Sequence, residues 1–186
     1  MAGRVMAEFK AACSFPVFPQ APPLSKWKAP PSGFLKVNTD AVMFKDGRYS
    51  CIRVIIHDSM VEILAALSKV LPALFSAEIS EALAIQEGML LAAEMEVSHA
   101  IFESNALSII QTINDGIHGG ELGHIIRNIR EVSSSFTWCS FQHLKREGNG
   151  VANELARVAG NLGASQVWKR AIPSLVKHLI TEDLCL

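Results

Sequence analysis

The 186-residue sequence lacks several features that mark specialised classes of protein. Its four cysteines lie far apart and form no C-x-x-C pair, which argues against a zinc site and fits reduced thiols. No apolar run reaches the roughly 18 residues that a membrane-spanning helix needs. The first residues also lack a basic segment followed by an apolar stretch, as a secretory signal would have. We therefore expect no membrane association and a cytoplasmic or nuclear location.

The composition is typical of a folded domain, with 49% hydrophobic and 19% charged residues. The net charge of −1 hides an asymmetry, since residues 1–57 carry eight basic and three acidic side chains. A basic N-terminal part is compatible with nucleic-acid binding, but an ordinary solvated surface of mixed charge explains this charge distribution equally well. Residues 1–32 contain six prolines and little periodicity, so we interpret them as a linker or arm.

Residue patterns beyond the arm predict an α/β domain with a mixed sheet. Strands are expected at residues 33–44, 49–57, 62–68, 100–103 and 136–144. Helices are expected at residues 76–96, 105–115, 121–132, 151–162 and 174–181. Asp46-Gly47 between the first two apolar runs is typical of a hairpin turn, so the first three strands should be antiparallel. This order predicts a five-stranded mixed sheet flanked by helices over residues 33–163, followed by a C-terminal helical extension over 164–186.

Three segments together resemble signatures of the plant ribonuclease H-like family, whose members derive from retroelements. They are Lys36-Val-Asn-Thr-Asp40, Ser80-Glu-Ala-Leu-Ala-Ile-Gln-Glu-Gly88 and Asn149-Gly-Val-Ala-Asn-Glu-Leu-Ala156. The match covers about residues 26–183 in the expected order. The resemblance implies a ribonuclease H-like fold, a monomer, and hydrolysis of the RNA strand in RNA–DNA hybrids. Four acidic side chains would hold two Mg²⁺ ions, or Mn²⁺, beside the phosphate to be cleaved.

The same resemblance assigns four catalytic positions, and only two of them are acidic. Asp40 in the first strand and Glu81 in the long helix would be metal ligands. Asn105 and Asn153 stand where the third and fourth acids are expected. Asparagine is nearly as large as aspartate but carries no charge, so the fold is preserved while metal binding should weaken. Glycine is also common in the family at the position of Arg53, inside the second strand.

Some of these residues have purely structural interpretations. Asn105 or Ser104 is a good N-cap for the helix that follows. Glu103 should point to the same face as Asn105, and so could replace the missing acid. Asn149 is equally well explained as a helix cap.

Contacts with nucleic acid are expected at Asn38 and Thr39 in the first motif, and at Arg146 and Asn149 before the last motif. Three functions remain open on the sequence alone. The first is a nucleic-acid-binding domain with weak or no cleavage activity, which the two asparagines favour. The second is an active metal-dependent ribonuclease acting on RNA–DNA hybrids. The third is a protein-interaction scaffold.

Overall fold

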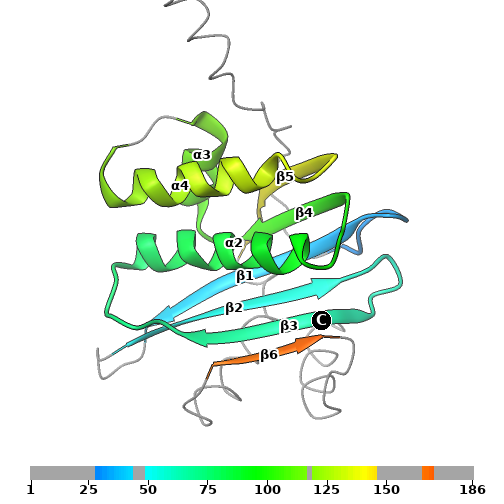
Figure 1. Cartoon of the computed structure of the whole chain (residues 1–186), viewed down its shortest axis with the longest axis horizontal. Coiled ribbons are helices and arrows are strands. Elements are labelled where there is room, and N and C mark those ends of the chain that lie inside the picture. The colour runs from blue at the N-terminus through cyan, green and yellow to red at the C-terminus, as the bar shows by residue number, and fades with distance from the viewer. Residues whose placement is uncertain (1–27, 44–48, 117–118, 146–164, 170–186) are drawn as a thin grey trace, which may run out of the picture.

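The computed structural model describes residues 28–43, 49–116, 119–145 and 165–169, which form one sheet and three helices (Figure 1). The six strands lie in the spatial order β5-β4-β1-β2-β3-β6. The strands are β1 (Leu35–Met43), β2 (Ser50–His57), β3 (Ile63–Val70), β4 (His99–Ser104), β5 (Trp138–His143) and β6 (Gln166–Lys169). The helices are α2 (Ala77–Ala93), α3 (Leu107–Asp115) and α4 (Gly120–Ser133).

Strand β1 lies inside the sheet and gives it its mixed character. It pairs with β2 in antiparallel register, with Asp40 opposite Arg53, and with β4 in parallel register, with Thr39 opposite Ser104. β3 is antiparallel to β2, and β5 is parallel to β4. Helix α2 supplies the crossover that a parallel neighbour requires, since it leads from β3 to β4. The predicted antiparallel pairing of the first three strands and the α/β class are confirmed.

The sheet has six strands, whereas the sequence predicts five. The additional strand β6 pairs with β3 in antiparallel register, from Ser68 opposite Gln166 to Ala65 opposite Lys169. It lies inside the segment for which we predicted a helical extension, so that expectation is wrong for residues 166–169. Four residues carry too little periodicity to indicate a strand. The strand pairs with the open edge of β3, and Lys169 also forms an exposed ion pair with Glu94, the residue that caps the C-terminus of α2.

Helix α2 begins where its sequence predicts and lies close against the sheet. The Ser76 hydroxyl accepts a hydrogen bond from the Ile79 amide at 3.3 Å, which makes Ser76 the N-cap. Gly88 faces the sheet, where an added Cβ would lie 2.9 Å from Thr39 Cγ2 and 3.0 Å from Val37 Cγ1. A glycine at this position therefore allows the helix to lie close against β1.

Helix α3 begins later than the sequence predicts. Its N-cap is Ala106, with no side-chain cap, and its first residue is Leu107. Neither Asn105 nor Ser104 caps it, which corrects our expectation. The Ser104 hydroxyl accepts a hydrogen bond from the Ala106 amide at 3.1 Å, so it orders the turn that precedes the helix instead. Gly116, with a φ of 77°, ends the helix as predicted.

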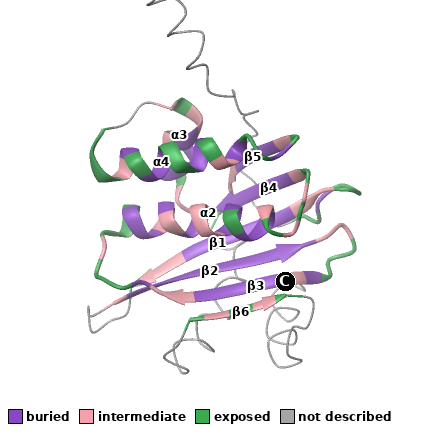
Figure 2. Ribbon diagram, viewed as in Figure 1, coloured by how far each residue is buried: buried purple, intermediate pink, exposed green. Residues whose placement is uncertain are grey.

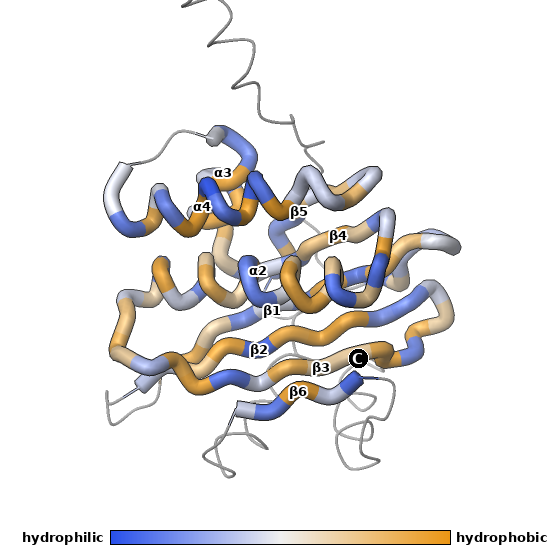
Figure 3. The backbone as a smooth tube through the Cα atoms, in the orientation of Figure 1, coloured by the Kyte–Doolittle hydropathy of each residue, from blue (hydrophilic) through white to orange (hydrophobic). Residues whose placement is uncertain are grey.

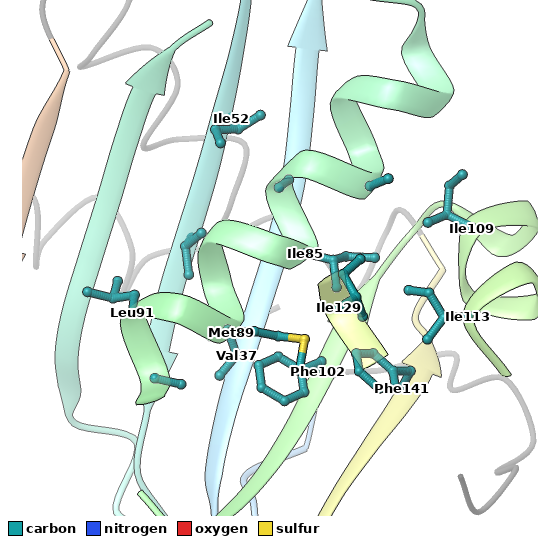
Figure 4. Packing of buried hydrophobic residues seen from close by; sticks show 14 of the residues in the cluster. Val37, Ile52, Ile85, Met89, Leu91, Phe102, Ile109, Ile113, Ile129 and Phe141 are labelled. Atoms are coloured by element: carbon teal, nitrogen blue, oxygen red, sulfur yellow. The ribbon is translucent and has the colours of Figure 1, made fainter. Parts of the chain in front are cut away.

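The hydrophobic core lies between the sheet and the three described helices (Figure 4). Figure 2 shows the central strands as almost continuously buried, and Figure 3 shows β2 and β3 as mainly hydrophobic with a few polar positions. Large core side chains from the sheet and the helices include Val37, Ile52, Ile85, Met89, Phe102, Ile113, Ile129 and Phe141. The backbone pairing of β1 with β4 holds the two strands side by side, and β1 carries three residues of the predicted site, Asn38, Thr39 and Asp40.

Candidate functional site

Two residues of the predicted site, Asn38 and Asp40, lie on the face of the sheet opposite α2. Val37, Thr39 and Val54 approach Gly88 of α2, so they point to the helix side. Successive side chains of a strand point to opposite faces, which places their neighbours Asp40 and Arg53 on the other side. Polar and charged residues that are at most 3% exposed in the three strands β1, β2 and β4 include Lys36, Asn38, Asp40, Arg53, His57 and Glu103.

Asp40 and Arg53 form a buried ion pair across β1 and β2. Arg53 Nη1 lies 3.4 Å from Asp40 Oδ2, and the residues are 1% and 3% exposed. The guanidinium stays charged at any pH at which the protein folds. A buried carboxylate without such a partner would be strongly destabilising. The carboxylate predicted as the first metal ligand therefore already has a positive charge beside it.

The turn signal at Asp46-Gly47 is sufficient to place Asp40 and Arg53 opposite each other in the hairpin. Asp40 stands six residues before Asp46, and Arg53 stands six residues after Gly47. A two-residue turn at Asp46-Gly47 places residues at equal distances from it opposite each other. The observed register, which continues to Met43 opposite Ser50, agrees with that symmetry. The sequence signal was thus available, although we noted Arg53 only as a departure from glycine.

Glu103 forms a second buried pair, with Lys36. The Lys36 ammonium lies 2.8 Å from Glu103 Oε1, and the Asn38 amide donates a hydrogen bond to Glu103 Oε2 at 3.0 Å. Burial raises the pKa of the Glu103 carboxyl, and Lys36 and Asn38 offset part of that rise. This arrangement does not favour Glu103 as a substitute for the acid missing at Asn105.

Two predicted nucleic-acid contacts lie in the interior. Asn38 is 1% exposed and binds Glu103, as described above. Thr39 is 0% exposed, and its hydroxyl donates a hydrogen bond to the backbone oxygen of Glu103 at 3.3 Å. Both side chains therefore tie β1 to β4, and their positions do not favour a direct contact with nucleic acid.

Asn105 lies directly after the end of β4. Thr39 is opposite Ser104 in the parallel register, so the next residues along the two strands, Asp40 and Asn105, stand at the same level. Asn105 is half-buried. The neutral amide thus lies near the C-terminal part of β1, where the resemblance calls for a third acid.

Glu81 approaches from the opposite side of the sheet. It is half-buried and stands seven residues before Gly88, so it lies on the same side of α2, the side that faces the sheet. Because α2 follows directly on β3, which runs parallel to β1, its first turns lie toward the C-terminal end of β1. Sharing of one metal ion by Glu81 and Asp40 stays a prediction.

Asn153, Arg146 and Asn149, the remaining predicted site residues, lie outside the described residues. Among the residues that are described, no three histidine, cysteine, aspartate or glutamate side chains gather closely enough to hold a metal ion. The Mg²⁺ or Mn²⁺ that the resemblance implies therefore does not fit the described part of the site. Asp40 is paired with Arg53, Glu103 is paired with Lys36, and Asn105 carries no charge.

Comparisons with known proteins agree with this fold. The model of a reverse transcriptase-like family matches residues 38–159. Ribonuclease H1 from Halobacterium salinarum superimposes with a TM-score of 0.62 at 15% identity, covering 69% of this chain and 98% of that one. LC11-RNase H1, solved in complex with an RNA/DNA hybrid, gives 0.58 at 18% identity, with coverages of 65% and 92%.

A foamy viral protease-reverse transcriptase, solved in complex with double-stranded DNA, gives a TM-score of 0.54 at 13% identity, with coverages of 67% and 90%. These likenesses establish the ribonuclease H-like fold. No curated protein matches the sequence significantly. Within the described ranges, none of the helices is long and apolar enough to cross a membrane.

Proposed function

Because this chain belongs to the reverse transcriptase-like family, we propose that it is a nucleic-acid-binding domain that recognises RNA–DNA hybrids and cleaves them weakly or not at all. Structures of the same fold hold an RNA/DNA hybrid in one case and double-stranded DNA in another. A domain of this kind would read the shape of the duplex, its 2′-hydroxyls and its phosphates rather than its base sequence.

The observation that carries the proposal is the neutral Asn105, which follows the last residue of β4 and stands at the level of Asp40 in the parallel strand β1. Magnesium beside a polyanion needs carboxylates to balance its charge and supply hard oxygen ligands. Loss of an outer-shell partner typically lowers metal affinity or activity by about 10–100-fold. Replacing an inner ligand by an amide should cost more, so binding of Mg²⁺ or Mn²⁺ is weakened.

The test combines a binding assay and a cleavage assay on one labelled RNA–DNA hybrid. Fluorescence anisotropy measures binding against double-stranded DNA and double-stranded RNA, at several salt concentrations because phosphate contacts depend on salt. Cleavage is measured with Mg²⁺ and with Mn²⁺ for the natural chain, Asn105→Asp and Asn105→Asp/Asn153→Asp. Asn128→Asp is the matched control, since it adds the same charge at an exposed position of α4.

We expect the natural chain and the Asn128→Asp control to bind the hybrid without cutting it. Cleavage by the aspartate variants alone would show that Asn105 and Asn153 are sufficient to account for the lost activity. Robust cutting by the natural chain would support the alternative of an active two-metal ribonuclease. Failure to bind any of the three duplexes would reject the proposal and leave the protein-interaction scaffold.

A further inference from the structure

The pair formed by Asp40 and Arg53 says more about this site than the loss of one acid. The inference drawn from this pair rests on the proposed function in one respect, namely that Asp40 stands at a metal-ligand position. The two residues are direct cross-strand partners, they share the face of the sheet opposite α2, and both are almost fully buried. The arginine is therefore part of the folded interior and is not a surface residue that happens to lie near the site.

A divalent cation at Asp40 would have to share the carboxylate with this guanidinium. Arg53 Nη1 is 3.4 Å from Asp40 Oδ2, and magnesium binds carboxylate oxygens at about 2.1 Å. Both cations would then lie within a few ångströms of each other, in an interior where like charges repel far more strongly than in water. Arginine cannot relieve this repulsion by losing its proton.

The surrounding charges do not compensate for the arginine. On the described part of this face, Lys36 balances Glu103 just as Arg53 balances Asp40. Asn105, at the end of β4, adds no negative charge. The described polar face is therefore close to neutral, whereas a site for divalent ions needs an excess of negative charge. The other acidic residue of the predicted site, Glu81, lies on α2 at the opposite face of the sheet.

We propose that Arg53 is a built-in counter-ion that takes the place of a divalent metal at Asp40. The chain then folds with its first acidic position already neutralised, and it binds nucleic acid without needing Mg²⁺ or Mn²⁺. The guanidinium is held by the sheet itself, so this charge is present whatever the metal concentration.

The test measures the melting temperature of the full chain during titration with Mg²⁺ or Mn²⁺, without nucleic acid. Arg53→Met keeps a long side chain but removes the charge, and Arg53→Lys keeps the charge. Lys69→Met is the matched control, because it removes one positive charge from the more exposed pair with Glu87. Asp40→Asn/Arg53→Met lacks both charges and defines the response to non-specific metal binding.

We expect the natural chain, Arg53→Lys and Lys69→Met to respond to metal no more than the double variant does. Arg53→Met should be less stable without metal and should be stabilised by it, with an apparent metal affinity at least roughly tenfold tighter than that of the natural chain. A saturable shift in the natural chain that exceeds that of the double variant would overturn the proposal, and so would an unchanged metal response in Arg53→Met. If Arg53→Met does not fold, Arg53→Gln takes its place in the titration, because it also removes the charge and keeps a polar side chain.

Hybrid binding separates this inference from the proposed function. The natural chain should bind the labelled hybrid with the same affinity in EDTA and in Mg²⁺ at matched ionic strength. Binding that requires metal would contradict the role of Arg53 while leaving the proposed function intact. Absence of binding in both buffers would reject the proposed function, and the metal titration would still decide the role of Arg53.

Discussion

A double-mutant cycle at Asp40 and Arg53 tests the buried ion pair through the stability of the protein. Two unit charges 3.4 Å apart attract by roughly 5 kcal/mol at an effective dielectric constant of about 20. Removing one partner of a buried pair leaves the other charge unbalanced and typically costs about 3–5 kcal/mol. We therefore expect Asp40→Asn and Arg53→Met each to lower the free energy of unfolding by that amount, and the double variant to lose much less than the sum.

The measurement is urea denaturation followed by circular dichroism, supported by thermal melting. For a chain of this length, 3–5 kcal/mol corresponds to a drop in melting temperature of roughly 6–20 °C. The same cycle at Lys69 and Glu87, whose side chains are 40% and 23% exposed, should give less than about 1 kcal/mol. The reasoning fails if Asp40→Asn costs no more than Glu87→Gln, or if the two losses at Asp40 and Arg53 simply add.

Three further predictions concern single positions. Burial lowers the pKa of His57 to about 4, so the unfolded chain takes up a proton near pH 6.5 while the folded chain does not. The free energy of unfolding should then fall by about 3 kcal/mol as the pH drops from neutral to 4. Denaturation at several pH values should show a shallower fall for His57→Gln than for His124→Gln at an exposed position. Gly88→Ala should lower the melting temperature, since its Cβ would lie 2.9 Å from Thr39 Cγ2 and overpacking costs about 1–3 kcal/mol; Thr39→Ser, which removes that methyl group, should restore part of the loss. Burial raises the pKa of the Cys139 thiol to about 11, so a thiol reagent at pH 8 should modify this residue, identified by mass spectrometry, only after unfolding; rapid labelling of the native chain would contradict its burial.

The sequence predicted those elements whose signals are local. The Asp46-Gly47 turn signal between the first two strands, the Ser76 cap and the Gly116 helix end all depend on residues within a few positions of one another. Strand β6 depends on tertiary pairing with β3, so local patterns gave the wrong result there. The start of α3 was predicted two residues too early, because Ser104 orders the preceding turn instead of capping the helix. A plant or retroelement origin and the monomeric state stay predictions.

The candidate site was predicted less completely than the fold, because charge partners depend on register. The sequence suggests Glu103 as a replacement metal ligand. In the structure, the parallel pairing of β1 with β4 brings Lys36 and Asn38 beside it. In the sequence, Arg53 is only a departure from the glycine common in the family. In the structure, the hairpin register places it opposite Asp40. The environment of Glu103 became visible only with the sheet assembled, whereas the partner of Arg53 follows from the symmetry of the hairpin about Asp46-Gly47.

The position of β6 bears on how the chain should be shortened in the laboratory. This four-residue strand covers Ala65–Ser68 of β3, so a chain ending before residue 166 would leave those backbone amides and carbonyls open along the margin of the sheet. An unpaired sheet edge of this kind readily pairs with strands of other molecules. A version trimmed to the boundaries of the family match would therefore be prone to self-association, and residues 166–169 should be retained in any minimal domain.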